Sequence, residues 1–501
     1  MIAVTWKATQ GGPYAIPEIF SPLSRVPKRD YLMDALSRIA LRGCLRERRS
    51  DIDGAAGRLN NPSIYSESRN GASVKLNLPL RRFLQAVILL SLVTVVVCWI
   101  EKDLLHLRSS SWYPFFERDW RFSDLTTFRE RFQYFHQLHF FTMSKQLFAY
   151  PAPVAFAIQF FLLLGPYAVV GYLAFCVLVF VGSGVLVGHA MHRRGLQARD
   201  TIVFISVSLL LSYPLLFLLD RANIEMVNWL LVALGVAAYW KKRWYLAAIF
   251  LGVAISFKIF PFVFLGLLFS SKKYGAAVLG VVVAVATTAL ATWMLGPTYQ
   301  IASTEIARGL EFYRTGWMLE IHPYEIGFDH SIYGFLKVLT FPGLQTQHEF
   351  YQHLLTRYMA VAATGGILLY FWKIRKLPRV NQILALTVAS ILFPPTSGDY
   401  TLMHLYIPWA ALVLFAVSVP EARKTPGLVF VFVCLAILMT SQGYVVFHYI
   451  KLNGMIKMIV LLFLLFASVS YPFEEQLNDG EVEQAAGSHA ADRHSLHSAT
   501  V

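Results

Sequence analysis

Residues 245–269 read YLAAIFLGVAISFKIFPFVFLGLLF, and Lys258 is the only charged residue in this apolar run. A lysine at the depth of the bilayer core costs about 2.5–3.5 kcal/mol, so a lysine in such a segment indicates a functional site. Pro261 follows three residues later, and because proline has no N–H to donate, it tends to break a helix close to the lysine. A cation beside a broken helix would suit an anionic ligand near a membrane surface.

The basic residues on either side limit what this run can form. Arg243 and Lys272 enclose it, with 28 residues between them. Two complete transmembrane helices would need about 40 residues. We therefore predict a short broken, re-entrant hairpin of 245–257 and 259–269, a backbone that is tolerated only inside protein or beside a wet cavity. The alternative for Lys258 is that its ammonium group snorkels to the interface.

The rest of the chain has the composition of a polytopic membrane protein. Of its 501 residues, 56% are hydrophobic and 15% are charged. Many runs approach the roughly 20 apolar residues that span a bilayer, which predicts an all-α fold with about 10–12 transmembrane helices and short interfacial helices in the outer loops. We place the spans at 83–100, 168–188, 200–219, 224–240, 276–295, 358–372, 380–394, 402–418, 427–446 and 454–470.

The positive charge is unevenly distributed. The net charge is +14, and residues 1–82 hold fourteen Lys and Arg against seven Asp and Glu, a surplus of +7. DNA binding is one interpretation, but a cytoplasmic flank that follows the positive-inside rule is favoured, so no nucleic-acid partner is expected. We predict a basic, flexible cytoplasmic segment (1–80), a multi-pass membrane domain (81–471) and a disordered acidic, His-bearing cytoplasmic tail (472–501).

The same rule places four polar segments on the outer face of the membrane, where an active site could assemble. They are 101–150, 220–223, 296–355 and 394–404. In the first, Asp124 could act as a general base towards a hydroxyl group, although Ser123 and Asp124 also fit a helix N-cap. In the second, the planar fork of Arg221 could bind phosphate, or Asp220 and Arg221 could form a local pair at a helix end.

The other two segments carry candidate substrate-binding residues. His322, Asp329 and His330 lie among aromatic residues and could bind a polar acceptor, or could belong to an amphipathic interfacial helix. Asp399, Tyr400 and His404 follow a proline-rich break, and His404 could transfer a proton or bind phosphate; a tight turn between spans is the alternative. The spacing of the His and Asp residues is not that of a metal site, and the four cysteines are scattered, so no metal or other cofactor is expected.

Taken together and in this order, the motifs resemble glycosyltransferase family 87, integral-membrane enzymes of the GT-C fold that use polyprenyl-phosphate sugars. The likeness covers about residues 80–450. Ala152 replaces one proline of the family's Tyr-Pro-Pro, and Tyr400 and Thr401 stand where some members have a catalytic histidine. The matching positions are Asp124, Tyr150 to Pro153, Asp220 to Asn223 with Glu225, Ala247 to Pro261, Asp329 to Ser331 and Pro394 to Tyr400.

The resemblance implies a hexosyltransferase of the plasma membrane with its active site on the outer face. The donor would be a polyprenyl-phosphate sugar, with polyprenyl-phosphate mannose favoured, and the acceptor a lipid or glycan. Asp124 would be the general base of an inverting displacement. The donor phosphate would be held by Lys258, Arg221 and His404, and the substrate by Tyr150, Asn223, Glu225, His322, Asp329, His330, Asp399 and Tyr400.

Two other functions fit the same residues. A transporter or flippase of lipid-linked sugars would also have broken helices and intramembrane charge, but such proteins are often built from inverted repeats, and we find no internal repeat. The third is a non-catalytic assembly subunit. Formation of a glycoside by the purified protein would distinguish the enzyme from both.

Overall fold

In the computed structural model the described residues all lie in one compact unit, Ser73–Val501. They are 76–100, 104, 121–143, 147–320, 327–340, 348–418, 427–440, 446–447 and 450–473. The predictions for residues 1–75, for the acidic tail 474–501 and for His322 lie outside the described residues.

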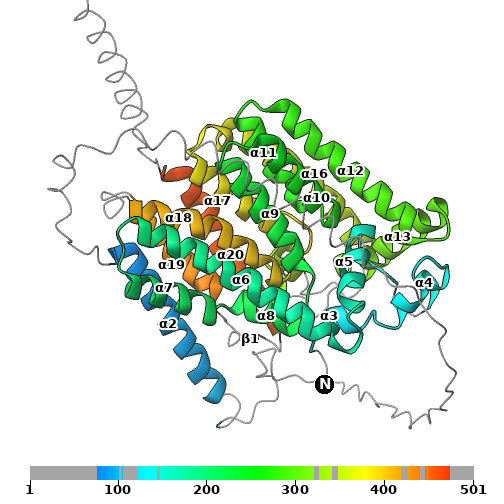
Figure 1. Ribbon diagram of the computed structural model, residues 1–501, viewed down its shortest axis with the longest axis horizontal. Coiled ribbons are helices and arrows are strands. Elements are labelled where there is room, and N and C mark those ends of the chain that lie inside the picture. Colours follow the sequence, from blue (N-terminus) through cyan, green and yellow to red (C-terminus); the bar gives the residue numbers. More distant parts are fainter. Residues whose placement is uncertain are drawn as a thin grey trace, which may run out of the picture. The chain divides into compact units, whose positions relative to one another are not determined.

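Helices make up nearly all of the described chain (Figure 1). The helices up to the Lys258 break are α2 (Leu78–Trp99), α3 (Ser123–Thr126), η4 (Arg131–Tyr134), α4 (His139–Thr142), α5 (Ala152–Leu162), η5 (Gly165–Tyr167), α6 (Ala168–Arg193), α7 (Ala198–Leu210), α8 (Tyr213–Arg221), α9 (Glu225–Trp240) and α10 (Trp244–Phe257).

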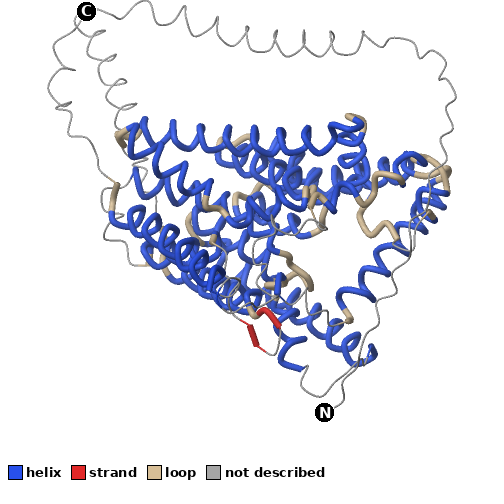
Figure 2. The backbone as a smooth tube through the Cα atoms, turned by 90° about the horizontal axis from the view of Figure 1, so that it is seen from below, coloured by secondary structure: helices blue, strands red, loops and turns tan. Residues whose placement is uncertain are grey.

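The chain after the break is also almost entirely helical. Its helices are η6 (Phe260–Phe264), α11 (Leu265–Ser270), α12 (Tyr274–Leu295), α13 (Tyr299–Tyr313), η7 (Arg314–Met318), α15 (Ile332–Thr340), α16 (His348–Trp372), η8 (Ile374–Lys376), α17 (Arg379–Leu392), η9 (Asp399–Leu405), α18 (Tyr406–Ser418), α19 (Leu428–Met439) and α20 (Asn453–Ser470). The strands β1 (Val446–Phe447) and β2 (Ile450–Lys451) form one small antiparallel pair, red in Figure 2. The all-α polytopic class is confirmed.

Fewer helices than predicted are long enough to cross a membrane. Among the described residues there are six, or seven if the pair α7 and α8 is one bent span. Six further apolar helices have 10–17 residues, and three of them, α9, α17 and α19, correspond to predicted spans. The six long spans are Leu78–Val97, Gly165–Arg193, Tyr274–Leu295, His348–Lys376, Asp399–Ser418 and Asn453–Ser470.

The span predicted at 200–219 is two helices with an angle of 49° between α7 and α8. Pro214 lies in the first turn of α8, where the missing N–H does no harm but the helix cannot continue backwards unbroken. Ser212 caps α8, since its Oγ accepts the backbone N–H of Leu215 at 3.2 Å. Helix α8, which follows the bend, ends at Arg221, just before Asn223 and Glu225.

The predicted break at Lys258 is confirmed. Helix α10 ends at Phe257, and Lys258 has extended backbone angles of φ −150° and ψ 142°. The preceding helix is held against α12 by a close glycine contact: a Cβ on Gly252 would lie 2.5 Å from the carbonyl oxygen of Gly280. Because apolar lipid gives helices no hydrophobic reason to associate, such small-residue contacts set helix positions within a membrane.

Helix α17 is the most deeply buried element of the described chain. Every residue from Val380 to Leu392 is buried, although the helix is only 14 residues long. It ends in the proline-rich break, which leads into η9. The residues of this second break are therefore fixed by the interior of the protein rather than by contact with solvent.

Candidate active site

Asp124 is held at the end of α8 by backbone contacts. Phe122, which precedes the short helix α3, has a left-handed φ of 56°, and its N–H donates to the carbonyl of Asp220 at 2.6 Å. Helix α3 has no side-chain cap, so Asp124 does not serve as the N-cap. Its Oδ2 instead accepts a hydrogen bond of 2.6 Å from Asn223 Nδ2.

Asn223 joins Asp124 to the beginning of α9. The chain turns at Ala222, which has a left-handed φ of 50°. Beyond the turn, Asn223 Oδ1 accepts the backbone N–H of Glu225 at 2.9 Å, and its carbonyl accepts the hydroxyl of Tyr172. Both ends of the Asn223 amide are thus used, and the position of its Nδ2 beneath Asp124 is fixed.

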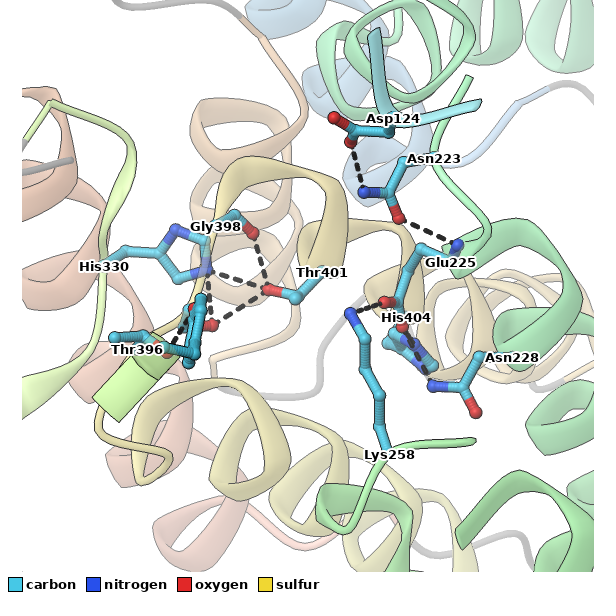
Figure 3. Close-up of polar contacts among 12 residues, drawn as sticks. Asp124, Asn223, Glu225, Asn228, Lys258, His330, Thr396, Gly398, Thr401 and His404 are labelled. Carbon is cyan, nitrogen blue, oxygen red and sulfur yellow. Dashed lines mark hydrogen bonds and ion pairs between the residues drawn. The ribbon is translucent and has the colours of Figure 1, made fainter. Parts of the chain in front are cut away.

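Glu225 is fully buried and gathers three donors (Figure 3). Its Oε2 pairs with the ammonium group of Lys258. Its Oε1 lies 2.8 Å from His404 Nε2 and 3.0 Å from Asn228 Nδ2. The Lys258 cluster is defined as Asp124, Asn223, Glu225, Lys258 and His404. It joins α3, the turn before α9, the end of α10 and η9.

Lys258 remains accessible within this cluster. Its side chain is 21% exposed, whereas that of Glu225 is 0% exposed. The Nζ atom lies 4.7 Å from the centre of the Tyr400 ring, a cation–π distance. The ring also fills the space beside Gly398, where a Cβ would come within 2.9 Å of Tyr400. Lys258 is therefore oriented by a carboxylate and an aromatic face, with part of its surface left open.

Arg221 brings a second cation to Asp124. Its Nη1 donates to the hydroxyl of Ser123 at 3.3 Å, next to Asp124 in the chain, and its guanidinium lies 5.7 Å from the centre of the Phe217 ring. Burial raises the pKa of the Asp124 carboxyl above its ordinary value of 3.8, while the Asn223 hydrogen bond and the charge of Arg221 oppose this increase. A carboxylate with a raised pKa is suited to accept a proton.

Tyr150 lies on the aromatic side of Asp124. Its ring is 5.9 Å from that of Phe128 and 5.7 Å from that of Phe148. Burial, followed by the nearby charge of Asp124, raises the pKa of its hydroxyl. The hydroxyl therefore stays protonated and can act only as a neutral hydrogen-bonding group.

A second polar cluster lies on the other side of η9. Asp399 Oδ1 accepts from Lys457 Nζ at 2.7 Å, and Oδ2 accepts from the hydroxyl of Tyr213 at 2.8 Å. His330 Nδ1 lies 3.5 Å from Asp399 Oδ1, and its Nε2 lies 3.1 Å from the hydroxyl oxygen of Thr401. We call Tyr213, His330, Asp399, Thr401 and Lys457 the Lys457 cluster. The side chains of Asp399 and Lys457 are each 1% exposed.

Asp329 is also occupied by the protein. It is 5% exposed, and its Oδ1 accepts the backbone N–H groups of Ser331 at 2.9 Å and Ser397 at 3.0 Å. Asp329 thus ties the start of α15 to the proline-rich break. Together with His330 and Asp399 it is buried away from the Lys258 cluster, although all three were predicted as substrate-binding residues.

The structure brings eight of the predicted site residues to one place, as members or neighbours of the Lys258 cluster. They are Asp124, Tyr150, Arg221, Asn223, Glu225, Lys258, Tyr400 and His404. Sequence reasoning missed Lys457, although a lysine within the apolar segment Asn453–Ser470 carries the same signal as Lys258. Among the described residues, no group of three His, Cys, Asp or Glu side chains is arranged to hold a metal ion.

Comparison with known proteins identifies the class. The family model for glycosyltransferase family 87 matches residues 148–395, about half of the chain. The protein is therefore a membrane glycosyltransferase. It belongs to glycosyltransferase family 87, as its motifs predicted. Searches of curated proteins and of solved structures found no match.

The match covers only part of the candidate site. Arg221, Glu225 and Lys258 lie within residues 148–395, whereas Asp124 and His404 lie outside them. Their assignment to the same site depends on the contacts with Asn223 and Glu225.

Proposed function

We propose that the protein transfers mannose from a polyprenyl-phosphate donor to a lipid or glycan acceptor. The observation that carries this proposal is the Lys258 cluster itself. It links a carboxylate with a raised pKa, Asp124, through Asn223 and Glu225 to a partly exposed lysine at a helix break. General-base catalysis and a cationic phosphate clamp are the two elements that such a transfer needs.

The transfer is a single displacement at the anomeric carbon. Asp124 accepts the proton of the acceptor hydroxyl while the hydroxyl oxygen forms a bond to the anomeric carbon. On the opposite face, the bond from this carbon to the phosphate oxygen breaks, and the electron pair stays on the phosphate. Polyprenyl phosphate leaves with one more negative charge, the proton resides on Asp124, and the anomeric configuration inverts.

Lys258 and Arg221 offset the charge that grows on the leaving phosphate. Groups already in place for that charge stabilise the transition state more than they stabilise bound substrate. Glu225 acts through Lys258, since its carboxylate holds the ammonium group and also accepts from His404 and Asn228. Glu225 and His404 are therefore positioning residues in this mechanism, and the exposed part of Lys258 contacts the phosphate.

The direction of the helices supports a site at the outer face of the plasma membrane. Lys258 follows the end of α10, and Glu225 begins α9. The basic residues Lys241 and Lys242 lie at the opposite ends of these helices, where the positive-inside rule would put the cytoplasm. With this orientation both chain termini would be cytoplasmic, as the sequence predicts.

The decisive test is Asp124→Asn in the purified full-length protein with labelled polyprenyl-phosphate mannose and candidate acceptors. Loss of a general base lowers turnover by about 10²–10⁴-fold. Because asparagine keeps the size of the side chain, donor binding and the thermal unfolding midpoint should stay close to those of the wild type. Asp200→Asn, a substitution in the first turn of α7, is the control and should leave turnover unchanged.

Two results would contradict the proposal. Unchanged turnover in Asp124→Asn would remove this residue as the base. Movement of the donor lipid across vesicle membranes by the wild type, with no glycoside formed from any acceptor, would favour a transporter.

A further inference from the structure

A polar pocket lies at the ends of the helices remote from the Lys258 cluster. Its volume is about 460 Å³. It is lined by Tyr239, Lys242, Trp244, Ser270, Ser271, Arg379 and Gln382. These residues come from the end of α9, the start of α10, the end of α11 and the start of α17.

The course of the helices separates this pocket from the candidate active site. Helix α9 begins with Glu225 in the active site and ends at Trp240 beside the pocket. Its 16 residues correspond to about 24 Å at 1.5 Å per residue. Helix α10 runs back from Trp244 in the pocket to the break at Lys258. The pocket therefore lies near the membrane surface opposite to the active site and cannot be a part of it.

The positive charge of the pocket is not neutralised by the described protein. Lys242 and Arg379 form no ion pair with any described residue. The segments that build the pocket cannot supply one, because the sequence has no Asp or Glu from 226 to 304 or from 350 to 398. Both side chains are exposed at the helix ends, so a ligand can reach them.

The remaining lining residues supply neutral hydrogen-bonding groups and an interfacial aromatic ring. The hydroxyl oxygens of Ser271 and Tyr239 lie 3.1 Å apart. Gln382 is 6% exposed, and its Nε2 donates to the carbonyl of Leu377 at 2.8 Å, but its Oε1 has no hydrogen-bond partner among the described residues. A buried acceptor of this kind requires a donor such as a hydroxyl group. Trp244 is of the type that lies at the level of lipid headgroups.

We propose that this pocket binds the headgroup of an anionic glycerophospholipid. The phosphate lies between Lys242 and Arg379, and a headgroup hydroxyl donates to Gln382 Oε1. The position at a membrane surface favours a lipid over a dissolved anion, because the headgroup is already held at that depth. Each basic residue near an anionic membrane surface strengthens binding by about fivefold.

The test compares two charge-matched variants of the full-length protein in detergent. Lys242→Gln with Arg379→Gln removes both cations of the pocket, whereas Lys241→Gln with Lys376→Gln removes two exposed cations that do not line it. Native mass spectrometry with phosphatidylglycerol or phosphatidylcholine measures retention of each lipid. We expect the pocket variant to bind phosphatidylglycerol about 25-fold less tightly, and the control variant to bind it within about twofold of the wild type.

Two further measurements test whether the pocket binds a lipid or a dissolved anion and whether the variants remain folded. Lys242 has a left-handed φ of 58°, so Lys242→Asn, which suits this conformation, should bind phosphatidylglycerol about fivefold less tightly while keeping its unfolding midpoint in phosphatidylcholine. Equal losses in both double variants would mean diffuse attraction to basic helix ends and would overturn the proposal. It would also be overturned if inorganic phosphate or glycerol phosphate displaced phosphatidylglycerol at equal concentration, since the pocket would then be a site for dissolved anions.

Discussion

The Lys258 cluster and the Lys457 cluster use the same chemistry for different purposes. Each pairs a lysine with a buried carboxylate, each carboxylate also faces a histidine, and each Nζ lies 4.7 Å from the centre of a tyrosine ring. The two sets are Lys258, Glu225, His404 and Tyr400, and Lys457, Asp399, His330 and Tyr213. The short helix η9 contributes Asp399 to one set and Tyr400 and His404 to the other.

The difference between them is access. The side chain of Lys258 is 21% exposed, whereas that of Lys457 is 1% exposed. The open cluster also contains a further carboxylate, Asp124, which is held by Asn223 and whose pKa is raised by burial. An ion pair closed to water contributes mainly to the fold, because neither partner can be exchanged for a ligand. The open pair is the one that can bind a phosphate.

The largest effect that would sharpen this comparison is expected for Lys457→Met. It leaves Asp399 buried without its cation, and removal of one partner from a buried ion pair costs about 3–5 kcal/mol. We expect this loss in the free energy of unfolding, measured by thermal or denaturant unfolding of the full-length protein in detergent. Lys457→Met combined with Asp399→Asn removes the unpaired charge and should recover most of the stability.

An unchanged free energy of unfolding in Lys457→Met would show that water reaches Asp399, and the distinction between an open and a closed cluster would fail. The same conclusion would follow if the double variant were no more stable than the single one.

Lys258→Met should have its main effect on turnover. Removing one preorganised group that faces developing negative charge lowers turnover by about 10²–10³-fold. The unfolding midpoint should fall less than in Lys457→Met, because Glu225 keeps His404 and Asn228 as donors. Steady-state kinetics with polyprenyl-phosphate mannose, together with donor titration, would measure both the loss of turnover and the loss of phosphate binding.

The matched control is Lys373→Met, which removes an exposed lysine after α16 and should leave both quantities unchanged. If Lys258→Met kept full turnover and lost only stability, Lys258 would be a second structural lysine and the phosphate clamp would have to be assigned elsewhere.

Much of the fold could be predicted because the length of an apolar run and the position of a proline determine where a helix begins and ends. The break at Lys258 and the spans at 224–240, 276–295 and 454–470 agree with α9, α12 and α20. The bend between α7 and α8 was not predicted, although Ser212 and Pro214 mark the start of α8, because the whole run of 200–219 is long and apolar enough to be interpreted as a single span. The predicted number of spans exceeds the six or seven long helices of the described chain because some apolar helices, such as α17, are shorter than a span requires.

The site could be predicted only in part, because the sequence does not show which residues far apart in the chain are in contact. Lys258 and Glu225 are 33 residues apart, but Glu225 and His404 are 179 apart. No local pattern distinguishes Asp399, which is paired with Lys457, from Asp124, which faces the open cluster. Both are carboxylates within two residues of an aromatic residue in the sequence, and only their neighbours in three dimensions assign them different roles.

The smallest effect concerns pH and would separate the two clusters by their influence on Asp124. Asp124 must be ionised to accept a proton, and burial raises its pKa, so kcat/KM should fall as the pH is lowered through a value above 3.8. Arg221→Gln removes a charge that lowers this pKa, which should move the acidic limb to higher pH. In Lys457→Met, the protein that remains folded should keep the acidic limb of its kcat/KM profile at the same pH as the wild type. Profiles between about pH 4 and pH 8 measure the shift, and a limb that moved equally in both variants would mean that Asp124 does not determine it.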